Sequence, residues 1–579
     1  MSRTSCKAEM KFIDITALED ATVSYENGQA FNDSSLFGQS DVVNHEDYGY
    51  FGRNSFILDG SKTIMPDTPT DIAFWSSEYS QYSCDFQHNP KITVVFDEYH
   101  TSSGLTLYFN NTWPAEMRIT WYDNNNEIIS KVFNPDQLIY ICNKQVKNYN
   151  KIEIEFLKTR FPEEYIQLQY ILYGKYVQWE ESDIRSAKLT EDIDITGATV
   201  SVNRANVEIV DEAENFNISI PNREWQSVQK NQEVTFTEVL DNVEVPLGKF
   251  FIKEFNFKQN IVSFELIDSV GVLDYFRFDK GQIYDNVLAG SIIADILNPT
   301  GLKYEVAEDI ASIPLKGYLA IQSSREALQK VAFVCGAVID DSRSDVIRIY
   351  KPDKKLIYII DVDRKLNGNT QVTQDEYVST VAIECSRYTL ATDSEEIYND
   401  SLSAGIHKIS FNGPVKADTI TVTGGTIVEA ATNYVVVSVP ISGEIIITGT
   451  SYQESKFTVS RSVNMIDGGA FENTKSFSDC TLYNNEVIQS KLVDLLEYYN
   501  LQKKVDIKFL VNNEQVGRWT NIKDTKGRNN ASLIESQSID LTGGFISVTK
   551  CRGYKQIVEN EYYAGGELLA SAGTGGAII

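Results

Sequence analysis

Histidine, the side chain that most often serves as a general base or zinc ligand, is scarce in this chain of 579 residues. The four histidines, His45, His88, His100 and His407, form no HExxH or HxH arrangement, so zinc hydrolysis lacks its ligands. A GxSxG elbow, a Walker loop and a GxGxxG fingerprint are also missing, and Gly424-Gly425 is typical of a turn. We therefore expect no enzymatic activity, no catalytic residues, no bound metal and no cofactor.

Carboxylates are the one abundant group with catalytic capacity, since the chain holds 81 Asp and Glu residues. Glycoside hydrolysis needs only two carboxyl groups at a suitable separation, so one sequence leaves this chemistry open. Glu153 and Glu155 show how such pairs arise here: at strand period they share one face of a strand. A solvated strand edge explains them more simply than an acid and a base.

Aromatic side chains in the first 176 residues are the more informative candidates for ligand binding. Trp75, Tyr79, Tyr82 and Trp113 lie among polar residues, and aromatic faces of this kind can stack on a sugar ring. A β-sandwich of this size must also bury several large rings in its core. Glycan binding and core packing therefore both remain open for these four residues.

The composition limits the partners. The net charge is −29 and the pI is near 4.6, which argues against a general affinity for nucleic acid through its phosphates, and we expect no specific nucleic-acid binding. The acidic balance serves solubility, or it lines a channel through which nucleic acid passes without sticking. No apolar run reaches the length of a membrane span, and the first residues lack the apolar core of a secretory signal. We expect a protein made in the cytoplasm, with its seven scattered cysteines as buried thiols.

Hydrophobic periodicity predicts a mainly β protein with minor α+β content, divided into several domains. Short runs such as Lys91–Phe96 and Lys151–Phe156 have strand length and alternate or run apolar. They predict an antiparallel β-sandwich that ends near Gly174, and Asp123–Asn126 predicts a hairpin turn within it. A charged connector follows, and further short strands over 184–290 predict a second β-domain.

Three helices are expected. Ser323 and Glu326 make a capping box, after which apolar residues fall on one helical face until Gly336. A second helix is predicted over Val287–Leu297, closed by Asn298-Pro299, and a third over Glu486–Tyr499. All three are expected to be structural.

Several short motifs in the first domain go beyond periodicity. They are Phe56-Ile-Leu-Asp-Gly-Ser61, Phe74-Trp-Ser76, Ile92-Thr-Val-Val-Phe96, Ser103-Gly-Leu-Thr-Leu107, Trp121-Tyr122 and Tyr170-Ile-Leu-Tyr-Gly174. In these motifs the segment 1–176 resembles the discoidin-like (galactose-binding-like, jelly-roll) domain carried by tail proteins of prophages in low-GC Gram-positive bacteria.

The rest of the chain carries a second ordered set of motifs. It comprises Phe216-Asn217 with Ile220-Pro221-Asn222, Gly248-Lys-Phe-Phe-Ile252, Phe264-Glu-Leu-Ile-Asp268, Ser324–Phe333 with Gly336-Ala-Val-Ile-Asp340, Asp345–Tyr350 and Ile539-Asp-Leu-Thr-Gly-Gly544. Their order is similar to that in baseplate hub proteins of contractile-tailed phages and phage-tail-like bacteriocins. The resemblance implies two tail-tube-like β-barrel domains per chain, at 184–282 and at 372–402 plus 465–555.

The resemblance also implies the remaining organisation. A small α+β domain would span 283–371, a small all-β insertion 403–464, and a flexible or partner-ordered tail 556–579. Three chains would form a homotrimeric, pseudo-hexameric ring in the virion, in contact with the tail tube protein, an adjacent tube-initiator ring, the central spike and other baseplate proteins. The acidic balance would then suit the lumen of that ring.

Two further functions stay open beside the hub. One is a receptor-binding tail protein whose first domain binds a host surface glycan, with the remainder as a mounting. The other is a tail-tip protein of a non-contractile phage, which shares the hub architecture.

Overall fold

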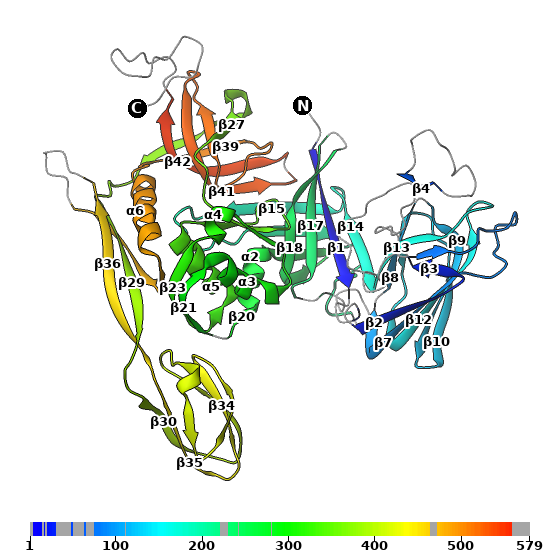
Figure 1. Cartoon of the computed structure of the whole chain (residues 1–579). Helices are drawn as coiled ribbons and strands as arrows, with labels where there is room; N and C mark the ends of the chain where they lie inside the picture. The colour runs from blue at the N-terminus through cyan, green and yellow to red at the C-terminus, as the bar shows by residue number, and fades with distance from the viewer. Residues whose placement is uncertain are drawn as a thin grey trace.

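The computed structural model describes residues 4–13, 17, 20–30, 48–49, 63–64, 74–102, 104–110, 112–220, 228, 230–240, 243–279, 281–463, 472–542 and 544–557. His45, the motif at 56–61 and the predicted tail from residue 558 onward lie outside these residues. Strands dominate and form several separate sheets, which confirms a mainly β, multidomain class (Figure 1). No helix in the described ranges is long and apolar enough to span a membrane.

The N-terminal part is a sandwich of two five-stranded antiparallel sheets. One sheet comprises β2 (Ala21–Glu26), β7 (Lys91–Ser102), β9 (Pro114–Asp123), β10 (Asn126–Phe133) and β12 (Val146–Thr159). The other sheet comprises β3 (Gly28–Ala30), β6 (Phe74–Ser76), β8 (Leu105–Phe109), β11 (Ile139–Cys142) and β13 (Gln167–Leu172). Alternate residues of β7 and β12 are buried against rings such as Phe74 and Trp121. The predicted hairpin is confirmed: Asn124 takes a φ of 53° between β9 and β10. A two-stranded sheet of β4 (Tyr48–Gly49) and β5 (Thr63–Ile64) accompanies the sandwich.

A 13-stranded sheet forms the centre of the molecule. Along its main path the order is β14 (Gly174–Trp179), β1 (Thr4–Ile13), β17 (Glu233–Leu240), β18 (Val243–Lys258), β19 (Ile261–Asp268), β16 (Arg204–Val210), β15 (Ile184–Asp192), β41 (Asn529–Asp540), β42 (Ile546–Gln556), β39 (Lys503–Leu510) and β28 (Lys365–Gln374). Beside β41 lie β40 (Trp519–Lys523) and then β27 (Leu356–Ile360). Both ends of the segment 1–176, β1 and β14, thus belong to this sheet rather than to the sandwich.

The sheet contains the same strand topology twice. The first β-unit has the spatial order β15-β16-β19-β18-β17, and the second β-unit has the order β28-β39-β42-β41-β40. In each, the first two strands in sequence lie side by side, followed in space by the fifth, fourth and third. All these neighbours are antiparallel.

The two units differ from the barrels that we expected. In the described residues they are parts of one open sheet, because β15 pairs directly with β41 and merges their edges. The boundary at residue 372 also moves: β28 begins at Lys365. Strands β29 (Thr380–Leu390) and β30 (Glu395–Leu402), inside the predicted 372–402, instead pair with β36 and β35 away from this sheet.

Helices pack beside the central sheet. They are α2 (Ser269–Val272), α3 (Ala289–Leu297), α4 (Glu308–Ala311), α5 (Ser324–Cys335) and α6 (Asn485–Tyr499), with 3₁₀ turns at Leu273–Tyr275, Asn298–Thr300, Val362–Arg364 and Ala417–Thr419. Small sheets around them use β20 (Arg277–Phe278), β21 (Gln282–Leu288), β22 (Tyr304–Val306), β23 (Pro314–Leu319), β24 (Gln322–Ser323), β25 (Val338–Asp340), β26 (Ile347–Tyr350) and β38 (Leu482–Tyr483). The capping box of Ser323 and Glu326 is confirmed, and the three predicted helices are α3, α5 and α6.

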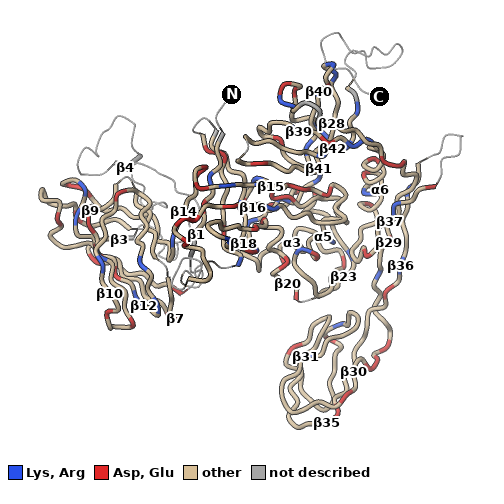
Figure 2. Tube along the Cα trace, turned by 180° about the vertical axis from the view of Figure 1, so that it is seen from behind, with Lys and Arg blue, Asp and Glu red and all other residues tan. Residues whose placement is uncertain are grey.

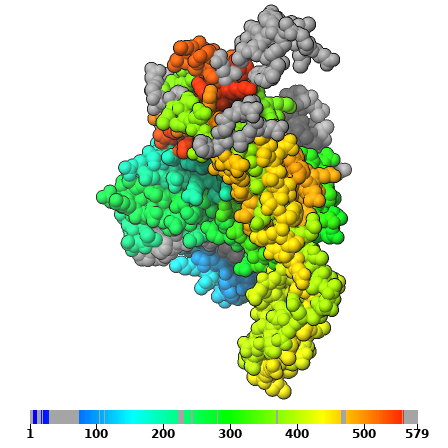
Figure 3. Space-filling model, turned by 90° about the vertical axis from the view of Figure 1, so that its left-hand side faces the viewer, coloured from blue at the N-terminus to red at the C-terminus, as the bar shows by residue number. Residues whose placement is uncertain are grey.

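A small β-module projects from the body, as Figure 3 shows. A long ribbon of β29 and β36 (Tyr452–Ser462), joined by β37 (Thr474–Cys480), leads to it. The module packs two three-stranded sheets from β30, β31 (Gly405–Ser410), β32 (Thr421–Thr423), β33 (Thr426–Ala430), β34 (Tyr434–Val439) and β35 (Gly443–Gly449) around its own core. The seven cysteines are free, and all except Cys84 are buried.

Candidate functional site

The described histidines do not gather around any reactive group. His100 is buried against the Asp20 carboxylate at 3.1 Å, while His88 pairs with Glu78 and His407 contacts a backbone oxygen. Within the described ranges, no group of three or more His, Cys, Asp or Glu side chains could hold a metal ion.

Glu153 and Glu155 lie on β12, and each forms an ion pair with a basic side chain. Lys151 contacts Glu153 at 2.7 Å, and Arg118 contacts Glu155 at 2.7 Å. Partial burial raises the pKa of Glu153, but hydrogen bonds from Lys151 and Tyr122 outweigh it and lower that pKa overall. A glycosidase acid needs a raised pKa, so this geometry favours the solvated strand edge.

Buried polar side chains gather at the junction of the two β-units. Five residue pairs join β15 to β41, from Lys188 opposite Asp540 to Asp192 opposite Ser536. Leu189 and Ile539, which face each other in the second of these pairs, are both buried. We call this ladder the seam. The buried Leu189–Ile539 pair and the backbone pairing fix the register between the two units.

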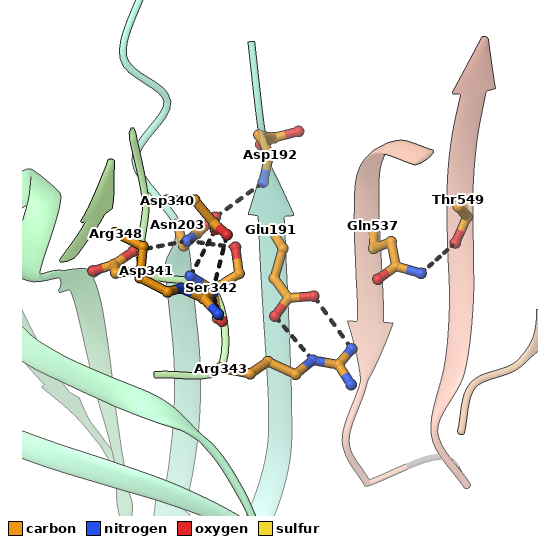
Figure 4. Close-up of polar contacts among 10 residues, drawn as sticks. All are labelled: Glu191, Asp192, Asn203, Asp340, Asp341, Ser342, Arg343, Arg348, Gln537 and Thr549. Atoms are coloured by element: carbon orange, nitrogen blue, oxygen red, sulfur yellow. Dashed lines mark hydrogen bonds and ion pairs between the residues drawn. The ribbon is translucent and has the colours of Figure 1, made fainter. Parts of the chain in front are cut away.

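A loop from the α+β part, residues 340–344, reaches the end of the seam (Figure 4). Its Arg343 donates hydrogen bonds from Nε and Nη2 to the two carboxylate oxygens of Glu191, at 3.0 and 3.2 Å. The side chains are only 6% and 1% exposed, respectively. Burial disfavours the Arg343 charge, yet the Glu191 carboxylate outweighs this and raises the Arg343 pKa above its ordinary value. This buried bidentate pair ties the loop to β15.

Asn203 connects the same loop to the first β-unit. Its Oδ1 accepts from the Asp192 backbone N–H at 3.0 Å, and its Nδ2 donates to Asp341 at 3.1 Å and to Ser342 at 3.2 Å (Figure 4). Arg348 donates to Asp340 at 3.0 Å on the other side of the loop. The loop is therefore held by side chains from two parts of the chain.

Two buried carboxyl groups, those of Asp268 and Asp341, share this site. Asp268 accepts backbone N–H groups of Asn203 at 2.6 Å and Gly271 at 2.7 Å. Burial raises the pKa of Asp268 to about 6, and it raises that of Asp341 well above its ordinary value. The hydrogen bond between the two groups favours the charged Asp268 and the neutral Asp341, which indicates that Asp341 carries the shared proton. This arrangement fastens three chain segments together and offers a substrate no open space.

The four aromatic candidates lie in different environments on the sandwich. Trp75 is 5% exposed and belongs to the interior, whereas Tyr79 and Tyr82 are 52% and 89% exposed. Both Trp75 and Tyr79 contact the ring of Tyr165 edge-on, with centroids 6.2 and 5.9 Å apart. The two tyrosine side chains are thus exposed to solvent, while Trp75 is buried and packs against the same Tyr165 ring as Tyr79.

Trp113 is half-buried and stacks under the guanidinium of Arg160, whose carbon lies 4.4 Å from the ring centre. Arg160 and Tyr165 belong to one loop between β12 and β13. This loop therefore brings three of the four predicted residues, Trp75, Tyr79 and Trp113, to one region. Sequence reasoning missed both Arg160 and Tyr165, because no local pattern marks a loop that returns beside distant aromatics.

A cavity of about 380 Å³ lies between α6 and the second β-unit. Its lining includes Lys491, Tyr498 and Trp519, with lysines and carboxylates both present. Burial lowers the pKa of Lys491 to about 8, and its ammonium donates to the Thr196 carbonyl at 2.6 Å. Lys491 thus holds the loop that contains Thr196 in place.

No family model matches this chain, and no curated protein matches it. Among solved structures it is similar to a tail protein from Neisseria meningitidis MC58, with 10% identity, a TM-score of 0.40, and coverage of 65% of this chain and 93% of that one. Prophage tail protein gp18 from Listeria monocytogenes EGD-e has 6% identity, a TM-score of 0.37, and coverage of 66% and 92%. The c3393 protein of E. coli, a type VI secretion component described as similar to T4 tail proteins gp27 and gp5, has 8% identity, a TM-score of 0.32, and coverage of 64% and 73%. These scores describe a loose likeness in fold to proteins of tails and tail-like systems.

Proposed function

We propose that this chain is the structural hub of a phage tail or tail-like injection particle. Three copies form a ring that joins the tail tube and its initiator ring to the central spike and the baseplate. Its place is the virion, after synthesis in the host cytoplasm. The chain acts by assembly and not by catalysis.

The observation that carries this proposal is the repeated topology of the central sheet. Two β-units with one strand order, joined edge to edge, make each chain a pair of quasi-equivalent building blocks. Three such chains supply six blocks. In the hub family that the sequence resembles, six units match a hexameric tube.

The polar site at the seam supports the same role. A ring needs its two blocks at a fixed angle, and the buried Glu191–Arg343 pair holds β15, the strand of the first β-unit at the seam, against the loop at 340–344. Acidic residues are distributed along the whole trace in Figure 2, so the charge of any lumen depends on which face of the sheet lines it.

Purified particles test the proposal. Quantitative mass spectrometry should find the chain at three copies per particle, and a cryo-EM map should place it between tube and spike. Particles that assemble fully without this chain would refute the hub role.

Glycan binding by the sandwich is the second candidate, favoured by the exposed rings of Tyr79 and Tyr82. In that case the discoidin-like domain would hold a host surface glycan while the sheet serves as its mounting. A glycan array with the full chain tests this, and an array without any bound sugar would exclude it for the glycans displayed.

A further inference from the structure

The two β-units can be aligned on a bulge that they share, which allows their edges to be compared. In β18 the pairing with β19 shifts by a bulge between Ile252 and Glu254, and in β41 the pairing with β42 shifts between Ile534 and Ser536. The bulges fall at the same place of equivalent strands. Bulges are specific features of a fold, so they anchor the alignment of the two units.

Rows of paired residues run across each unit from these bulges. In the first β-unit the row is Ile252, Leu266, Ala205 and Leu189, and in the second it is Ile534, Cys551, Val505 and Val372. Val372 on β28 is therefore equivalent to Leu189 on β15. Counted along the strands from the bulges, Phe257 on β18 is equivalent to Ile539 on β41.

Leu189 and Ile539 are the two residues that meet at the seam, and each is 1% exposed. Their equivalents lie on open edges: Val372 is 48% exposed and Phe257 is half-buried. In the described part of the chain, β28 pairs only with β39, and Glu254–Lys258 of β18 pairs only with β19. In the described residues, one pair of equivalent edges, β15 and β41, is joined at the seam, while the other pair, β28 and residues 254–258 of β18, has no strand along its outer side.

We propose that β28 of one copy pairs antiparallel with residues 254–258 of β18 in a second copy, in the register of the seam. Val372 then faces Phe257, and Gln374 faces Phe255, as Leu189 faces Ile539 and Glu191 faces Gln537 within the chain. The inference rests on the proposed hub function and specifies its subunit contact.

The pairing explains why an exposed valine and a half-buried phenylalanine lie at strand edges, which is a hazard for an isolated chain. It is a heterologous contact, with different surfaces on the two partners, and such contacts close into rings when the rotation permits. Each copy repeats the contact that its own two units already make. Units of the first and second kind then alternate around the ring.

Paired cysteines in the full chain test the contact. Val372→Cys combined with Phe257→Cys, and Gln374→Cys combined with Phe255→Cys, are matched pairs, built on a Cys84→Ser background because Cys84 is the one native thiol that is not buried. Val372→Cys with Asn256→Cys is the control, since Asn256 is next to Phe257 in β18 and its side chain points to the opposite face of the sheet. Seven strand spacings, about 34 Å along the sheet, separate β28 from β18 in one chain, so a link must join two chains.

Mild oxidation should link both matched pairs at least about tenfold faster than the control, because pairing gives these thiols a high effective concentration. Multimers would then appear on non-reducing gels. Monomers from every variant, or equal linking of matched and control pairs, would overturn the proposed contact.

Failure of this contact and failure of the hub role are separable. Particles that contain three copies but show no matched link would support the hub function and exclude the proposed pairing of these edges. A matched link in a chain that no tail particle contains would support the pairing and exclude the hub function. A Val372→Glu variant adds a second measurement, since native mass spectrometry of the full chain should show loss of multimers while the circular dichroism spectrum of the folded chain stays unchanged.

Discussion

The first prediction concerns the buried ion pair of Glu191 and Arg343 at the seam. Arg343→Met removes the guanidinium and leaves the Glu191 carboxylate, 1% exposed, without its two hydrogen bonds. Breaking a buried pair by removing one partner costs about 3 to 5 kcal/mol. Because the pair ties the loop at 340–344 to β15, we expect the loss to appear as local opening of the seam rather than as global unfolding.

Hydrogen exchange measured by mass spectrometry on peptides from β15 and β41 is the appropriate assay. The expected loss corresponds to exchange that is faster by about two to four orders of magnitude. The control is Glu497→Gln, which breaks the pair with Lys354, shorter at 2.6 Å but 58% and 69% exposed. An exposed pair contributes at most about 1 kcal/mol, so this control should change exchange little.

A double variant separates charge from packing. Glu191→Met together with Arg343→Met removes both charges, and the protection of the seam should largely return, because two apolar chains avoid the uncompensated carboxylate. The reasoning would be refuted by a single variant that exchanges like the wild type. It would also be refuted by a double variant as unprotected as the single one.

Three further predictions concern other parts of the molecule. Burial raises the pKa of Asp268 to about 6 from 3.8 and raises that of Asp341 well above 3.8, so the folded state binds both protons more tightly than the unfolded state, and stability should fall as pH rises from about 4 to about 6 and beyond; Asp341→Asn removes one of the two titrating groups and should make this slope less steep in pH-dependent melting curves. Gly317→Ala should destabilise by about 3 kcal/mol or more in urea titrations, because φ is +128° and a Cβ would meet the Thr481 carbonyl oxygen at 2.1 Å, whereas Gly301→Ala, with φ +69° and open space, should cost only about 1 kcal/mol. Tyr79→Ala should weaken binding to any glycan found on an array by about fivefold, a loss of about 1 kcal/mol of ring contact.

Each of these has a clear contrary result. Parallel pH curves for wild type and the Asp341 variant would show that Asp341 does not bind its proton more tightly in the folded state than in the unfolded state. Equal losses for the two glycine variants would mean that the strand around residue 317 moves aside. Unchanged glycan binding in the Tyr79 variant would place the sugar elsewhere on the sandwich.

Local signals in the sequence were sufficient for individual elements. The capping box at Ser323 predicts α5 correctly, because a cap depends on residues three positions apart. Likewise Asp123–Asn126 predicts its hairpin, since asparagine tolerates the positive φ that the turn requires. Alternation predicts the sandwich strands, because burial of one face imposes period two.

The candidate site could be predicted from the sequence only in part. Of the four predicted aromatics, Trp75 proved to be interior, since polar–apolar patterning does not reveal which ring a returning loop will cover. The seam depends on contacts between residues more than three hundred positions apart, such as Leu189 and Ile539. Nothing near Arg343 in the sequence indicates that its partner is Glu191.

The sequence by itself therefore determined the secondary structure, the mainly β class and the lack of recognisable catalytic motifs, because these depend on residue types and on short spacings. Only the tertiary structure decided that the two β-units form one sheet, that a loop from the α+β part fastens their junction, and which edges stay open. The physical reason is that strand pairing uses backbone groups common to all residues, so the choice of partner depends on which edges the complete fold brings together.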